Sequence, residues 1–164
     1  MMREPAPRAR GLPLWFSIGF HFTRIMRVVT TICGNYQRDN TLHAGDALLR
    51  SAVRFDAILA ANDVMALAML EVLAAAGLPR IVTGINAVPD AIAAIKQGTL
   101  LATADFDAMK MGCLATEAAI RHLRGERVPG EILLPVQVVD RTNYGRWDKP
   151  FADRECPRWE DVVN

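Results

Sequence analysis

This sequence has almost no excess of charge of either sign. Nineteen lysines and arginines stand against 18 aspartates and glutamates, so the formal net charge at pH 7 is +1. The broad basic surface by which most domains bind nucleic acid is therefore absent, and we expect no nucleic-acid partner. With 164 residues, 51% of them hydrophobic, the chain is long enough for one ordinary domain with a core and short for two.

Cysteine and histidine are also too few and too scattered to indicate a metal site. The cysteines are Cys33, Cys113 and Cys156, and the histidines are His21, His43 and His122. No CxxC pair occurs, and the histidines have no ligand spacing to one another, so we expect neither a zinc site nor a disulfide framework. Cys33 and Cys113 lie inside apolar runs and are expected to be buried small hydrophobic residues. No cofactor is expected.

Catalytic machinery is equally missing. The sequence contains no legible Ser-His-acid arrangement and no glycine-rich phosphate loop. Asp105 and Asp107 could act as a paired acid and base, but residues at successive positions around a turn seldom point at one atom. We therefore expect that the protein is not an enzyme.

The amino terminus lacks a complete export signal. Basic residues precede an apolar stretch, but Pro13 interrupts it and His21 and Arg24 follow in place of a small-residue cleavage site. The stretch is also too short to span a bilayer. We treat residues 1–25 as an amino-terminal remnant, residues 26–142 as the folded domain and residues 143–164 as a polar carboxyl-terminal tail.

From residue 26 onward, short strand-like runs alternate with longer helical patterns. Strands are predicted at 26–33, 55–60, 80–85, 100–105 and 131–140, and helices at 39–53, 64–77, 89–98 and 107–125. Pro135 places the last strand at an edge or across a bend. This alternation predicts right-handed βαβ units in an α/β, Rossmann-like fold, with a parallel sheet between two helical layers (αβα).

Polar and aromatic side chains follow the predicted strands, where strand-to-helix loops converge at one edge of a parallel sheet. These residues are Tyr36, Asn62, Asn86, Asp105 and Phe106. Amide and carboxylate groups suit the paired hydrogen bonds of hydroxyls, and an aromatic ring can pack on the C–H face of a sugar. The pattern therefore predicts a site for a small polyhydroxylated ligand.

Structural roles remain open for the same residues. Asp63 and Asp107 are expected to be helix N-caps. Since one cap suffices, Asn62 either contacts ligand or braces the backbone. Asn86 could simply shape the turn before Pro89. Tyr36 and Phe106 could be ordinary packing residues.

Two stretches resemble a known family. They are FDAILAANDVMALAMLEVLAAAG (55–77) and IVTGINAVPDAIAAIKQGTLLATADFDAMKMGCLATEAAIRHLRGERVP (81–129). Their motifs are specific in combination: strand-AxND-helix, G-x-[DN]-x-x-P-[DE]-A, G-x-x-x-A-T and K-M-G. The chain resembles the carboxyl-terminal lobe of ribose-binding-like periplasmic proteins, the sugar- and polyol-binding components of ABC importers, from about residue 27 to about residue 143.

The resemblance implies a role for each candidate residue. Asn62 matches the family's sugar-binding asparagine, and Tyr36 an aromatic that packs on the ring. Asn86 stands where many members have aspartate, and Phe106, beside Asp105, where glutamine is frequent. These two replacements make another pentose, a hexose, a polyol or a cyclitol as compatible with the site as ribose.

The resemblance also implies a two-lobed clamp in the periplasm that delivers its ligand to importer membrane subunits. Because residues 1–25 do not form a convincing signal peptide, a cytoplasmic location stays open as the alternative. We expect this chain to be a truncated or half-clamp form with weak or no binding alone, able to form a homodimer through the face left by a missing lobe. Two alternatives remain open: the effector domain of a sugar-responsive transcription regulator, and a ligand-free, self-associating remnant. The regulator's helix-turn-helix and Pro-Pro-Leu-Thr-Thr pattern are not found in the sequence.

Overall fold

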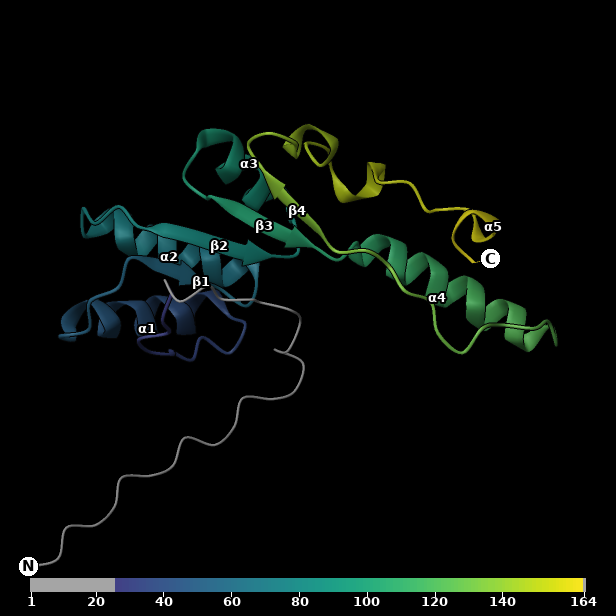
Figure 1. Ribbon diagram of the computed structural model, residues 1–164, viewed down its shortest axis with the longest axis horizontal. Coiled ribbons are helices and arrows are strands. Elements are labelled where there is room, and N and C mark those ends of the chain that lie inside the picture. The colour runs from purple at the N-terminus through teal and green to yellow at the C-terminus, as the bar shows by residue number, and fades with distance from the viewer. Residues whose placement is uncertain (1–25, 164) are drawn as a thin grey trace, which may run out of the picture.

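The computed structural model describes residues 26–163 (Figure 1). Our expectations for residues 1–25 lie outside this range. The helices and strands are α1 (Arg38–Arg50), β1 (Ala57–Leu59), α2 (Asp63–Ala75), β2 (Ile81–Ile85), α3 (Pro89–Gln97), β3 (Ala102–Asp105), α4 (Ala108–Leu123), β4 (Gln137–Asp140) and α5 (Trp159–Val162). Short 3-10 turns, η2 (Tyr144–Arg146) and η3 (Phe151–Asp153), lie between β4 and α5.

The strands form one mixed sheet in the order β1-β2-β3-β4. The first three are parallel, with Ile58 opposite Val82 and Gly84 opposite Thr103. β4 pairs antiparallel with β3, placing Val139 opposite Thr103. The α/β class is confirmed. β4 lies at the edge of the sheet, as we predicted from the position of Pro135. The all-parallel expectation was wrong for this strand, because the chain returns beside β3 in the opposite direction.

The strand predicted at residues 26–33 is not formed, so that prediction was wrong. The segment has no regular secondary structure, and most of its residues are exposed. β-Branched residues favour an extended chain, but a strand exists only where a neighbour's backbone pairs with it. Among residues 26–163, β1 pairs with β2 alone and its other edge stays unpaired.

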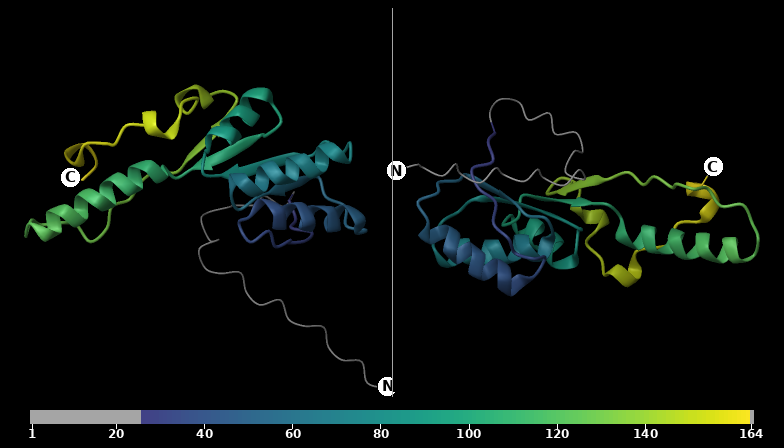
Figure 2. Two further views of the ribbon diagram at one scale, coloured as in Figure 1. Left: turned by 180° about the vertical axis from the view of Figure 1, so that it is seen from behind. Right: turned by 90° about the horizontal axis from the view of Figure 1, so that it is seen from below.

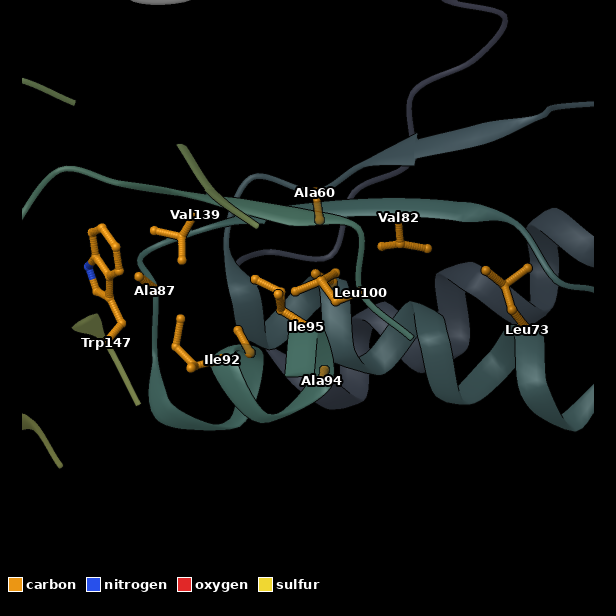
Figure 3. Packing of buried hydrophobic residues seen from close by; sticks show 12 residues of the cluster. Ala60, Leu73, Val82, Ala87, Ile92, Ala94, Ile95, Leu100, Val139 and Trp147 are labelled. Carbon is orange, nitrogen blue, oxygen red and sulfur yellow. The ribbon is translucent and has the colours of Figure 1, made fainter. Parts of the chain in front are cut away.

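The hydrophobic core lies between the sheet and helices α2 and α3 (Figure 3). Val82 and Val139 point from the strands toward Ile92 and Ile95 of α3, and all four are almost completely buried. The indole of Trp147 closes one end of this cluster beside Ala87. The core therefore joins the strands to a residue near the carboxyl terminus.

The opposite face of the sheet is largely uncovered in the described part of the chain. Leu59, Ile81 and Val138 are 62%, 53% and 62% exposed, whereas alternate residues such as Val82 are buried. In Figures 1 and 2, α4 runs outward from the end of β3 and does not lie across this face. Helices α2 and α3 pack on the other face, where the core lies.

Helix α1 packs against α2, and a glycine makes the close approach possible. A Cβ atom at Gly45 would lie 2.9 Å from the sulfur of Met69 and 3.2 Å from a methyl group of Val72. Both distances are shorter than ordinary van der Waals contacts, so a larger residue would push the helices apart.

The cysteine expectations were wrong. Cys113 on α4 is disulfide-bonded to Cys156, with 5.8 Å between their Cα atoms, and Cys33 is an exposed free thiol. The apolar neighbours of Cys33 and Cys113 suggested burial, but residues 26–33 have no partner and α4 stands away from the sheet. Apart from Leu114, their hydrophobic neighbours are consequently exposed or half-buried.

Candidate ligand-binding site

The ends of β1, β2 and β3 and the turn before α1 form the edge where we expected a ligand. Every non-glycine residue with positive φ in residues 26–163 lies in one of these connections. They are Asn35, Tyr36, Asn86, Ala87 and Asp107, with φ of 49°, 58°, 121°, 52° and 57°. Such conformations are costly for residues with a Cβ atom and collect at functional sites. The strain therefore supports this edge as the candidate site.

Asn62 is the N-cap of α2, a role that we had assigned to Asp63. Its side-chain oxygen accepts a hydrogen bond from the Met65 backbone N–H at 2.8 Å. Its amide nitrogen lies 3.4 Å from the carbonyl oxygen of Tyr36 and donates to it. A primary amide has two donors and two acceptor lone pairs. One donor and one lone pair of the half-buried Asn62 thus remain for another partner.

Asp63 is instead a completely buried bracing residue at the first position of α2. One carboxylate oxygen accepts from the Thr103 hydroxyl at 2.7 Å and the other from the Val88 backbone N–H at 2.9 Å. Asp63 thereby ties α2 to β3 and to the start of α3. Burial raises the pKa of this carboxyl, although the hydrogen bonds from Thr103 and Val88 oppose the shift.

This raised pKa predicts that stability depends on pH. Above about pH 4, the ordinary aspartate pKa, the unfolded chain loses the Asp63 proton while the folded chain retains it. The Asp63 contribution to the free energy of unfolding should therefore fall as pH rises toward the raised pKa. Asp63→Asn mimics the protonated acid and does not titrate, so its free energy of unfolding should lack this dependence on pH. Urea unfolding from pH 4 to 7 would measure the difference, and a wild-type stability that rises relative to the variant would contradict the prediction.

Asn86 ends β2 in a strained turn. Its backbone N–H donates to the carbonyl of Ala104 on β3 at 2.9 Å, which brings the ends of these strands together. The next N–H, of the buried Ala87, lies 3.3 Å from the Thr103 hydroxyl oxygen. The Asn86 side chain makes no hydrogen bond to another described residue, and the residue is half-buried. Its amide is thus free for another partner.

Asp105 and Phe106 end β3. Asp105 is 7% exposed, and both of its oxygens accept hydrogen bonds: one from the Asp107 N–H at 2.8 Å, the other from the Trp147 indole N–H at 2.7 Å. Asp105 thus holds Trp147 in place. Phe106 is half-buried. Asp107 is the N-cap of α4, as predicted, and accepts from the Lys110 N–H at 3.1 Å.

Tyr36 is 55% exposed, so its ring is available at the edge and is not part of the core. The neighbouring Arg38 forms an ion pair with Glu71 on α2 and another with Asp39. Arg38 therefore links α1 to α2.

Sequence reasoning missed two residues that border this edge, Trp147 and Arg154. A guanidinium nitrogen of Arg154 donates to the Ala87 carbonyl oxygen at 2.9 Å and to the Trp147 carbonyl oxygen at 3.3 Å. The guanidinium also stacks over the Phe151 ring, 4.2 Å from its centroid. Burial lowers the pKa of Arg154, and Asp105 and Asp107 oppose the shift. Neither residue directly follows a predicted strand, so only the aromatic residues of the polar carboxyl-terminal segment could have drawn attention to Trp147.

Two clefts border the carboxyl-terminal residues, and neither is lined by the five candidate residues. The larger, of about 690 Å³, lies between α4 and residues 156–160; the other lies between α3 and residues 147–151. The candidate edge therefore lies outside both of these clefts. No metal-binding cluster of His, Cys, Asp or Glu occurs among residues 26–163, and no helix there is long and apolar enough to cross a bilayer.

Comparison with known proteins gives a consistent answer. A family model described as a periplasmic binding protein domain matches residues 21–127. The ribose import binding protein RbsB of Bacillus subtilis is 34% identical over 122 residues, 73% of this chain and 40% of its own.

Solved structures agree with the sequence comparisons. An ABC transporter solute binding protein from Bacillus halodurans with bound myo-inositol matches with a TM-score of 0.65 and 32% identity, over 68% of this chain and 39% of that one. An ABC transporter periplasmic solute binding protein from Actinobacillus succinogenes with bound D-allose matches with a TM-score of 0.65 and 27% identity. This match covers 69% of this chain and 40% of that one. The chain thus spans about 40% of the length of the relatives that it matches.

Proposed function

Because the chain belongs to the periplasmic binding protein domain family, we propose that its sheet edge binds a sugar, polyol or cyclitol for an ABC-type importer. The contact residues in this proposal are Tyr36, Asn62, Asn86 and Phe106. Asp105 acts through Trp147, because it is buried and its oxygens accept from the Asp107 N–H and the Trp147 indole N–H. By its family, we assign the protein to the periplasm.

The observation that carries the proposal is the unused hydrogen-bonding capacity of two asparagines in adjoining connections. Asn62 has one donor and one lone pair left after capping α2, and the Asn86 amide makes no hydrogen bond to another described residue. Neutral amides can donate to one hydroxyl oxygen and accept from a second hydroxyl, as vicinal diols require. The backbone carbonyl of Tyr36 accepts from the Asn62 amide, and the side chain of this exposed residue would offer an apolar ring face to C–H groups.

The ligand in this proposal is neutral. Arg38 is paired with Glu71, and Asp63 and Asp105 are buried and hydrogen-bonded. No unpaired cation is therefore offered to an acidic sugar by these residues. The relatives with bound myo-inositol and D-allose make a cyclitol and a hexose the first compounds to test.

Binding by the described residues alone should be weak, because an open edge contacts one side of a ligand. A dissociation constant in the millimolar range corresponds to only about 4 kcal/mol. We expect tighter binding only where a second lobe closes over the ligand. That lobe would come from the same polypeptide or from another copy of it. Delivery to importer membrane subunits should require the same closure.

The proposal is tested by titrating the ¹⁵N-labelled protein with ribose, D-allose, myo-inositol and other polyols up to about 50 mM, which is about fiftyfold above a dissociation constant of about 1 mM. We expect one class to shift the side-chain amide signals of Asn62 and Asn86 and the backbone signal of Phe106. Signals that move only outside these connections, or no movement with any compound, would refute the assignment.

Replacement of Asn62 separates binding from capping. Asn62→Ser keeps an N-cap oxygen for the Met65 N–H but loses the amide, so the affinity should fall at least tenfold with little change in stability. Asn62→Ala should lose the affinity and also about 1 kcal/mol of stability. Equal affinities for wild type and Asn62→Ser, read from the same titration, would exclude a ligand contact at Asn62.

A further inference from the structure

The carboxyl-terminal residues 141–163 run from the end of β4 past α3 and on to α4 (Figures 1 and 2). Near α3, Lys96 donates to Asp148 at 2.7 Å, and Trp147 donates to Asp105. Arg154 then reaches the carbonyl of Ala87, in the connection after β2. Beyond it, Cys156 is bonded to Cys113 of α4. We call residues 148–163 the strap.

The disulfide is the strongest attachment between the strap and α4. The other contacts there are an ion pair from Arg121 to Glu160 at 3.1 Å and stacking of Arg121 over the Trp159 ring at 4.9 Å. Glu160 is exposed, and exposed ion pairs are weak. α5 spans four residues, too few for a helix that persists alone. Without the covalent bond, little would hold the strap on α4.

The strap in turn positions α4. Leu114 is the one buried residue of this helix, at 4% exposure, and the cleft that it lines is completed by Cys156, Pro157 and Trp159 of the strap. Among residues 26–163, no other helix or strand packs extensively on α4. α4 begins directly after Phe106 and Asp107 of the candidate site. Strap and site are therefore mechanically connected.

We propose that the Cys113–Cys156 disulfide is a redox-dependent fastener, whose reduction frees the strap from α4 and from the connection after β2. Cys156 is exposed, so a dithiol can reach the bond. The dithiol supplies two electrons and two protons, the S–S bond breaks to give the thiols of Cys113 and Cys156, and the reagent becomes its own cyclic disulfide. An oxidising compartment keeps the strap fastened.

Limited trypsin digestion of the whole chain, with and without dithiothreitol, tests the proposal. Cleavage after Arg154, whose guanidinium is held by Ala87 in the fastened state, should be at least tenfold faster after reduction. Cleavage after Arg146 is the internal control, because Trp147 remains buried and bonded to Asp105. Mass spectrometry of fully reduced peptides gives both rates. Equal rates after Arg154 in the two states, or rates that rise together at both positions, would overturn the proposal.

Cysteine variants supply the matched comparison. Cys113→Ser should show the fast Arg154 cleavage with or without reductant, whereas Cys33→Ser should behave as wild type, because Cys33 is free. Peptide mapping of the oxidised chain should find Cys113 linked to Cys156. A link from Cys33 to either residue, or slow cleavage in Cys113→Ser, would also overturn the proposal.

Discussion

Asp63→Ala should lower the free energy of unfolding by about 4 kcal/mol, because each buried polar group that loses its partner costs about 1–3 kcal/mol. The variant removes the acceptor of the Thr103 hydroxyl at 2.7 Å and of the Val88 N–H at 2.9 Å. Water cannot replace it readily, since Asp63 is 0% exposed. The connections among α2, β3 and α3 would be lost together. Urea denaturation at pH 7, followed by circular dichroism, measures this loss.

Asp46→Ala is the control for this experiment. Asp46 lies on α1, is exposed and makes no hydrogen bond or ion pair among the described residues, so its removal should change stability by less than about 0.5 kcal/mol. Asp63→Asn should recover more than half of the loss, because an amide can donate to Thr103 and accept from Val88. Equal stability of Asp63→Ala and Asp46→Ala would mean that Asp63 does not brace the sheet.

Gly84→Ala should lower the free energy of unfolding by about 3 kcal/mol, at the upper end of the cost of overpacking a core. A Cβ atom at this buried strand position would lie 2.1 Å from a carboxylate oxygen of Asp63 and 3.2 Å from the Cβ of Ala66. The carboxylate cannot swing aside without breaking its bond to Thr103, and Ala66 belongs to α2. One methyl group would thus displace both the helix and the bracing acid.

The matched control is Gly112→Ala, within α4. A Cβ atom there would have no heavy atom within 4 Å, and alanine favours a helix over glycine by about 1 kcal/mol. The two methyl additions should therefore shift the thermal midpoint in opposite directions, which differential scanning calorimetry resolves. A Gly84→Ala variant as stable as wild type would show that α2 can move away from β2 at little cost.

The helices could be predicted from the sequence because their signals are local. Asp107 caps α4, Pro89 begins α3, and Gly98 ends it with φ of 82°. Each of these residues acts on the backbone within a few positions of itself. All four predicted helices are present with small differences at their ends.

Strands were predicted less well, because a strand depends on partners elsewhere in the chain. Residues 26–33 and 131–136 have suitable composition but no neighbouring strand in the described structure. The direction of β4 has the same origin, because side chains alternate with a period of two in parallel and antiparallel strands alike. Only its pairing with β3 decides the direction.

The candidate edge could be predicted from the sequence, but the hydrogen bonds within it could not. The convergence of connections at one sheet edge follows from βαβ topology, so its position could be inferred. The exchange of roles between Asn62 and Asp63 could not, since either side chain can cap a helix and the choice depends on Val88 and Thr103, 25 and 40 residues away. The Cys113–Cys156 disulfide could not be predicted either, because its two cysteines are 43 residues apart in the sequence and only the fold brings them together.

The five positive-φ residues have a consequence for how ligand preference can change. Their strain, of order 1–3 kcal/mol each, is already compensated by the folded domain, so the backbone of the three connections is shaped before any ligand arrives. A ligand that docks there need not order a loop, and ordering is a main cost of association. In the proposed function, a new ligand preference would therefore arise by replacing the side chains at positions 62 and 106, where φ is not positive, while the backbone conformation stays the same. At position 86 fewer residue types are tolerated, because its φ of 121° disfavours most side chains.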